Sequence, residues 1–83
     1  MAEKEVGEVS IYFSNIDVAA IRLLGPLSVG DKIHILGHTT DFEQEVSSMH
    51  IENTPVAKAK KGQHVGIKVI ARVRPKDKVY IVK

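Results

Sequence analysis

Hydrophobic and polar residues alternate along most of this chain, which is the pattern expected of β-strands. The clearest run extends from His64 to Val73, where every second residue from Val65 to Ala71 is apolar. The other alternating runs are Glu5 to Phe13, Ile16 to Leu24, Lys32 to Leu36, Glu43 to Glu52 and Lys78 to Val82. Because successive side chains on a strand point to opposite faces, each run has one face suited to burial. The pattern therefore predicts about six strands and no long helix.

Two of these runs carry a more specific expectation. In the first run Val9, Ile11 and Phe13 share one face, which is predicted to be buried. The run from Glu43 to Glu52 is ambiguous, because Phe42, Val46 and Met49 also fit helical spacing. Its short length favours a strand with a bulge. The polar stretch from Gly37 to Phe42 is expected to be a loop.

Residues that favour turns separate the runs. Gly25-Pro26 interrupts the second run, Gly30-Asp31 turns the chain into the next one, and Gly62 precedes the run that begins at His64. Regularly spaced strands with short turns predict an all-β fold, a small six-stranded antiparallel closed β-barrel. A closed barrel has no free edges, which suits a chain with a limited core. Five aliphatic residues are expected to share its interior, namely Ile33, Ile35, Val65, Ile67 and Val69.

Composition limits the size and chemistry of the fold. With 83 residues and no cysteine, we expect one barrel domain over residues 6–83 and a flexible N-terminus over residues 1–5. Disulfides and thiolate metal sites are excluded. No apolar run has the length of a signal peptide or a membrane span. We therefore expect a cytoplasmic protein with no membrane partner.

Charge is divided unevenly between the two halves of the sequence. Up to Ala57 there are three basic and nine acidic residues, whereas from Lys58 onward there are nine basic residues and Asp77 is the one acid. Such an asymmetry is typical of a surface that meets a polyanion. The alternative is that charges from the two halves mix in space once the chain has folded.

The sequence offers little chemistry for catalysis. His34 and His38 lie at strand spacing and would permit a metal site with His50 or His64, but no His-x-Glu or clustered carboxylate accompanies them. Surface or hydrogen-bonded histidines are the expectation. The phosphate-binding pattern Gly-x-x-x-x-Gly-Lys-Ser/Thr is absent, so no nucleotide binding is expected. We expect no enzyme activity, no catalytic residue, no metal and no cofactor.

Several stretches together resemble a known domain. The segments Leu27-Ser-Val-Gly-Asp-Lys-Ile-His-Ile35 and Ala59-Lys-Lys-Gly-Gln-His-Val-Gly-Ile-Lys-Val69 are similar, in order and spacing, to the second domain of the translational GTPases, which include elongation factor Tu and initiation factors. The resemblance covers nearly the whole chain from Gly7. It implies a stand-alone six-stranded antiparallel barrel without the GTPase domain. A similar barrel is also appended to some peptidase-like RNA-modification enzymes.

In that family the barrel contacts transfer or ribosomal RNA, so the resemblance implies an RNA-binding module for translation. None of the family's contact residues forms a motif that carries over. We therefore predict phosphate contacts from the basic second half of the chain, namely Lys58, Lys60, Lys61, Lys68, Arg72, Arg74, Lys76 and Lys78. The expected partner is tRNA, rRNA or a ribonucleoprotein. The alternative is a protein-interaction subunit that docks onto a separate enzyme or GTPase through an exposed apolar patch.

Overall fold

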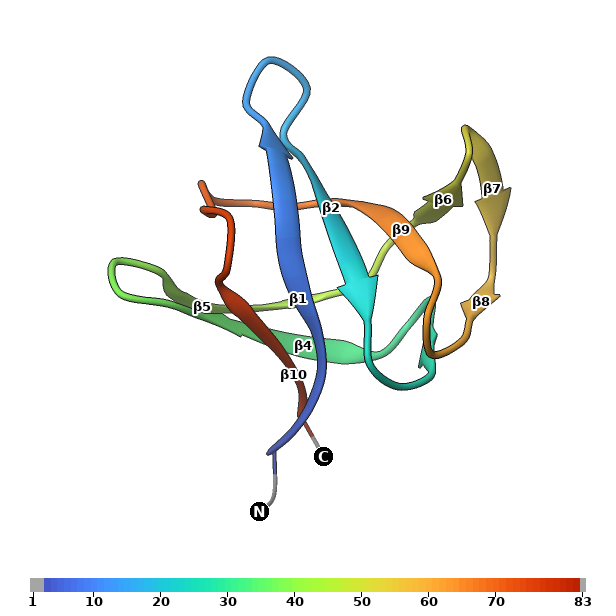
Figure 1. Cartoon of the computed structure of the whole chain (residues 1–83), viewed down its shortest axis with the longest axis horizontal. Coiled ribbons are helices and arrows are strands. Elements are labelled where there is room, and N and C mark those ends of the chain that lie inside the picture. Colours follow the sequence, from blue (N-terminus) through green and yellow to red (C-terminus); the bar gives the residue numbers. More distant parts are fainter. Residues whose placement is uncertain (1–2, 83) are drawn as a thin grey trace.

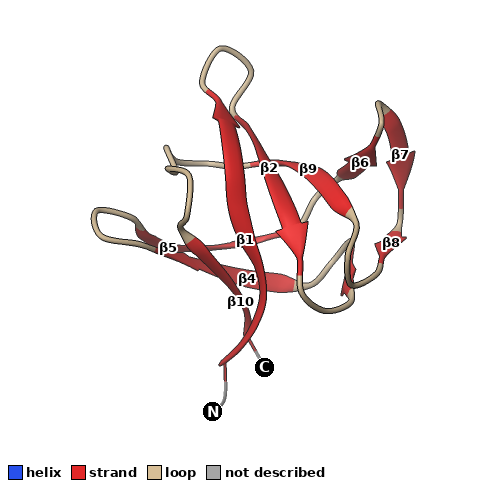
Figure 2. Cartoon of the chain, in the orientation of Figure 1, coloured by secondary structure: helices blue, strands red, loops and turns tan. Residues whose placement is uncertain are grey.

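The computed structural model describes residues 3–82, which form ten strands and no helix (Figure 2). The strands are β1 (Glu3–Phe13), β2 (Val18–Leu23), β3 (Leu27–Ser28), β4 (Lys32–Leu36), β5 (Asp41–Glu45), β6 (Met49–Ile51), β7 (Thr54–Val56), β8 (Lys58–Ala59), β9 (His64–Lys68) and β10 (Lys78–Val82). The predicted all-β class is therefore confirmed. β1 begins inside the segment predicted to be flexible, and residues 1, 2 and 83 lie outside the described part.

Eight strands form one antiparallel sheet in the order β5-β4-β10-β1-β2-β9-β6-β7 (Figure 1). The two short strands β3 and β8 pair separately. Antiparallel pairing is as predicted. The closed barrel of six strands is not confirmed, because the long sheet ends at β5 on one side and β7 on the other. Both end strands are blunted, β5 by its acidic residues and β7 by Pro55.

The inner faces of the curled sheet enclose one hydrophobic core. The five aliphatic residues predicted to share an interior are all in it, each at most 4% exposed. On β2 both faces are partly apolar in the sequence, and the structure buries the face that carries Ala19, Ile21 and Leu23. The core is completed by residues outside regular alternation, including Val46 and Val73.

The prediction for β1 is wrong beyond Val9. The pairing of β1 with β2 shifts by one residue between Val9 and Ile11, which is a β-bulge at Ser10. A one-residue shift moves every later side chain to the opposite face. Ile11 and Phe13 therefore point outward, at 52% and 44% exposure, and Tyr12 packs against the core.

The turn into β4 forms as its residues indicate. Gly30 has a positive φ of 97°, a conformation that favours glycine. The Asp31 carboxylate accepts a hydrogen bond from the backbone amide of Ser28 at 2.9 Å, so the predicted role of Asp31 is confirmed. The backbone of Val46 then pairs with Gly30 and Asp31, and this turn thereby connects the ends of β4 and β5.

Three predicted segments differ from the structure in their boundaries. The segment predicted as a loop from residue 37 to 42 contains the start of β5 at Asp41. The ambiguous run is neither a helix nor one bulged strand, because it separates into β5 and β6. The strand predicted over His64 to Val73 ends at Lys68, and Ala71 is exposed rather than buried.

The side chain of Gln44 on β5 makes hydrogen bonds to the backbone at the end of β9 and just after it, where β5 and this segment are not paired as strands. Its amide nitrogen donates to the Lys68 carbonyl, and its amide oxygen accepts from the Ile70 amide, both at 2.9 Å. These are the two hydrogen bonds that a neighbouring strand would make. Gln44 is buried, at 8% exposure, so it fixes this gap in the curled sheet.

We expect Gln44→Ala to lower the free energy of unfolding by about 1–3 kcal/mol, because two backbone groups lose their partner. Chemical denaturation monitored by circular dichroism measures this change. The matched control is Glu45→Ala, since Glu45 is an exposed neighbour on the same strand and is expected to change stability by less than about 0.5 kcal/mol. Equal effects of the two substitutions would contradict a bridging role for Gln44.

No helix long and apolar enough to cross a membrane occurs in residues 3–82.

Candidate functional site

The basic residues predicted to bind RNA do not lie on one strand or turn. Lys58, Lys60 and Lys61 belong to β8 and the following turn, whereas Arg72, Arg74 and Lys76 belong to the connection between β9 and β10. Figure 1 shows β8 and this connection at opposite sides of the molecule. Lys68 lies at the end of β9, on the outer face of the sheet. These seven side chains are exposed.

Lys78, the last of the predicted contacts, is held in an ion-pair network. Its ammonium lies 3.1 Å from a Glu8 carboxylate oxygen and 3.6 Å from one of Glu5, across the β1–β10 pair. The hydrogen bond to Glu8 and the attraction of both carboxylates raise the pKa of Lys78. Here a cation of the basic half meets acids of the acidic half, so the two halves mix in space at this point.

The histidines divide between two environments. His34 lies between Asp41 and Tyr80, with its Nε2 2.6 Å from the Asp41 carboxylate and its ring centroid 6.4 Å from that of Tyr80. His38 is exposed in the turn between β4 and β5. His50 and His64 line a groove over β2 and β9. Within residues 3–82 no group of three or more His, Asp or Glu side chains is arranged to hold a metal ion.

The groove follows from which residues the sheet brings together on its outer face. Ile11 of β1 pairs with Ala20 of β2, Ala20 with Gly66 of β9, and Gly66 with His50 of β6. Residues paired across antiparallel strands point to the same face. The two central positions carry only a methyl group and a hydrogen, whereas larger side chains stand on both sides. The outer face is therefore hollow above Ala20 and Gly66, and the pocket there has a volume of about 470 Å³.

The apolar wall of this groove is the tip of the β1–β2 hairpin. Phe13 and Ile16 line it and are 44% and 55% exposed, with half-buried Val18 below them. The tip is held in place by the Tyr12 hydroxyl, which donates to the Asp17 carboxylate at 3.0 Å, and by the Asp17 carbonyl, which accepts from the Val69 amide. Desolvation and the Asp17 carboxylate raise the pKa of Tyr12. Large exposed apolar side chains gathered at one place are typical of interaction sites.

The polar wall is the turn between β6 and β7, which lies to the right of the β1–β2 hairpin in Figure 1 and lines the groove through Glu52 and Asn53. Glu52 and Asn53 form a two-residue hairpin loop, and both have positive φ, 50° and 65°. Positive φ at both central residues is the type I′ geometry, which matches the twist of the flanking strands. His50 and His64 complete this wall. The groove therefore has one apolar wall, one polar wall and a narrow floor of small residues.

Sequence reasoning did not find this groove, because it assigned Ile11 and Phe13 to the core. The bulge at Ser10 leaves no sign in the sequence, because the three-residue spacing of buried Val6 and Val9 reflects a separate irregularity of β1 between Glu5 and Gly7. A glycine within a strand indicates a close approach of neighbouring groups, and a Cβ at Gly66 would lie 3.3 Å from the side-chain atom Cγ1 of Val18.

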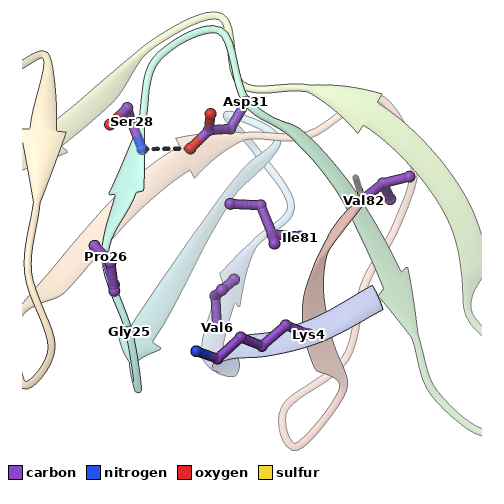
Figure 3. Close-up of a pocket in the computed structure, with 8 residues that line it drawn as sticks. All are labelled: Lys4, Val6, Gly25, Pro26, Ser28, Asp31, Ile81 and Val82. Carbon is purple, nitrogen blue, oxygen red and sulfur yellow. Dashed lines mark hydrogen bonds between the residues drawn. The ribbon is translucent and has the colours of Figure 1, made fainter. Parts of the chain in front are cut away.

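A second pocket of about 460 Å³ lies between the ends of β1 and β10 and the segment that contains β3 (Figure 3). Val6 and Ile81 are part of its lining, and Lys4 and Asp31 are its charged residues. The Asp31 carboxylate already accepts the Ser28 amide that shapes the turn. This pocket is therefore built mainly from residues that fold the chain, and the groove above Ala20 and Gly66 is the better candidate site.

Comparison with known proteins gives relatives of a different kind from those expected. No protein-family model matches the chain. An uncharacterized protease of Methanocaldococcus jannaschii is 42% identical over 80 residues, which are 95% of this chain and 20% of that protein. A collagenase of Porphyromonas gingivalis is 43% identical over 77 residues, 90% of this chain and 21% of that protein. The chain thus spans about a fifth of the length of these relatives.

The fold also matches a solved structure. The C-terminal domain of a putative U32 peptidase of Geobacillus thermoleovorans superimposes with a TM-score of 0.91, covering 96% of this chain and 93% of that domain. The sequence identity is 19%, so this likeness shows the fold alone. A selenomethionine variant of the same domain gives a TM-score of 0.87 at 20% identity.

These relatives correct the expected identity and function. The assignment to the second domain of translational GTPases, and with it the role as an RNA-binding module of translation, is wrong, because the relatives are a protease, a collagenase and a peptidase domain by name. The physical reason lies in the two segments that carried the resemblance. Each is a glycine turn followed by an alternating aliphatic strand, which small β-domains need in order to fold whatever they bind.

Proposed function

We propose that this chain is a non-catalytic accessory domain of a peptidase-like enzyme and packs against the catalytic part of that enzyme. The observation that carries the proposal is the 42% identity over 80 residues to a named protease of which those residues form only 20%. Catalysis is assigned to the remaining part of such an enzyme, and this chain supplies a folded binding surface. This is the role of a protein-interaction domain that docks onto an enzyme.

The internal contacts of the chain support an accessory role. Buried and half-buried polar side chains serve the fold, since buried Gln44 bridges two segments, buried Asp77 accepts from the Arg74 amide at 2.9 Å, and half-buried Asp31 holds a turn. The apolar side chains of Phe13 and Ile16, in contrast, are exposed to solvent and are not part of the hydrophobic core. Domain interfaces within enzymes commonly bury such surface.

A binding experiment tests this proposal. The probe is the Methanocaldococcus protease expressed without the 80 residues that match this chain, after a cooperative thermal transition has shown that the fragment is folded. We expect this chain to bind the fragment at 1:1 stoichiometry with a Kd of about 10 µM or lower in isothermal titration calorimetry. The matched control is the protease's own 80-residue segment added in trans. If that segment binds and this chain neither binds nor competes with it, the proposal is contradicted.

A further inference from the structure

We propose that the groove above Ala20 and Gly66 is the docking surface, and that it takes an apolar side chain of the enzyme's catalytic part that is flanked on both sides by carboxylates. This inference rests on the proposed function and adds to it the surface and the chemistry of the partner segment. It is carried by the shape of the groove, by its apolar wall and by the charges at its two ends.

The shape of the groove selects a single inserted side chain. Ala20 and Gly66 are neighbours in the β2–β9 pair, so the hollow crosses both strands at one position. Phe13 and Ile16 stand on one side of it and the β6–β7 turn on the other. An apolar side chain that fills this hollow would cover exposed surface of Phe13 and Ile16, which are 44% and 55% exposed. Burial of apolar area contributes about 25 cal/mol for each Å² removed from water.

The ends of the groove are marked by cations. Arg22 of β2, two residues after Ala20, pairs with His64 of β9. Val18 of β2, two residues before Ala20, pairs with Lys68 of β9. Arg22 and Lys68 both point outward, because the intervening residues of their strands are buried. Four residues along a strand span about 13 Å. The groove therefore has a cationic side chain at each end of an apolar centre.

Both cations are available to a partner. The Arg22 guanidinium lies 3.9 Å from Glu8, but that carboxylate is closer to Lys78, at 3.1 Å, and Arg22 keeps 54% of its side chain exposed. Within residues 3–82 Lys68 makes no ion pair. Among the residues that line the groove the acid is Glu52, which lies in the β6–β7 turn and not at either end, whereas Asp17 lies outside the lining and accepts a hydrogen bond from the Tyr12 hydroxyl. Charge complementarity therefore favours a partner segment with carboxylates on either side of its apolar anchor.

The experiment uses the same protease fragment as the binding test above. We expect Ala20→Glu, which fills the hollow and adds a negative charge, to weaken binding by about 10-fold or more. The double variant Phe13→Ser/Ile16→Ser should have a similar effect; it alters exposed side chains only, and so tests the groove even if Ala20→Glu does not fold. The double reversal Arg22→Glu/Lys68→Glu should weaken binding and reduce its dependence on salt concentration.

The matched control is Ile70→Glu, which changes an apolar residue that is 76% exposed and lies outside the groove. Its affinity should stay within about 2-fold of the wild type.

If the wild-type chain binds and the three groove variants bind equally well, the groove inference is overturned while the proposed function stands. If the protease's own segment binds the fragment and the wild-type chain neither binds nor competes with it, the proposed function fails. If the wild type forms a dimer that Ala20→Glu dissociates, in analytical ultracentrifugation, the occupant is a second copy and the enzyme segment is excluded.

Discussion

Replacing Ile67 by alanine is expected to lower the free energy of unfolding by about 2–5 kcal/mol, the usual cost of truncating a large aliphatic side chain in a packed core. Ile67 is completely buried and lies in β9, whose neighbours in the sheet are β2 and β6. Its partners in register, Ala19 and Met49, are also buried, so the cavity would open at the centre of the core. Small domains have only about 5–15 kcal/mol of stability, so this loss is a large fraction of the total.

The chain offers a matched control three residues further on. Ile70→Ala makes the same chemical change at a side chain that is 76% exposed, and it is expected to change stability by less than about 0.5 kcal/mol. Urea denaturation of both variants, with the same m-value as the wild type, measures the difference. Similar stabilities for the two variants would show that β9 does not face the core as described.

Gly7→Ala is expected to lower the free energy of unfolding by about 1–3 kcal/mol, the range for inserting a methyl group into a well-packed site. A Cβ at this position would lie 2.7 Å from the Ile21 Cγ2 atom and 3.0 Å from the Arg22 carbonyl oxygen. Neither atom can move easily, because Ile21 is fully buried and the carbonyl belongs to the backbone of β2. The β1–β2 pair would therefore have to separate.

The sign of this effect is informative. At positions with enough space, Gly→Ala stabilises a protein by about 0.4–1 kcal/mol, because alanine restricts the unfolded chain. Gly25 is such a position, since its φ is not positive and a Cβ there would lie 4.0 Å from the Val6 Cγ1 atom. The free energy of unfolding should therefore fall for Gly7→Ala and rise for Gly25→Ala, which thermal or chemical denaturation measures. A neutral or stabilising Gly7→Ala would contradict the close approach of β1 and β2.

The fold brings some acidic residues of the first half of the chain next to a basic residue of the second half. Because β1 pairs with β10, the acids Glu5 and Glu8 lie beside Lys78 although they are about seventy residues apart in the chain. Among the described residues, the other basic side chains of the second half lie on β8, the turn that follows it, β9 and the connection to β10. Charge counted along the sequence does not reveal the pairing of Lys78 with Glu5 and Glu8, because pairing across strands is not visible in a linear count.

The candidate groove is the feature that sequence reasoning missed. Part of its floor follows from the sequence, since a glycine within a strand, such as Gly66, indicates a close approach of neighbouring groups. Its apolar wall does not, because alternation assigns Phe13 to the core. The small share of each relative that the chain covers and the exposed wall both support the proposed docking role, whereas the turn and strand segments that resemble translation factors indicate only the architecture.

The sequence by itself determined the all-β class, the antiparallel pairing, the turn at Gly30-Asp31 and the buried faces of β4 and β9. These features follow from short-range preferences, because alternation and turn residues act within a few positions of the chain. Only the tertiary structure decided the bulge at Ser10, the bridge made by Gln44 and the groove above Ala20 and Gly66. Each of these depends on the register between strands that are distant in sequence, and a shift of one residue in that register turned Ile11 and Phe13 from the core to the surface.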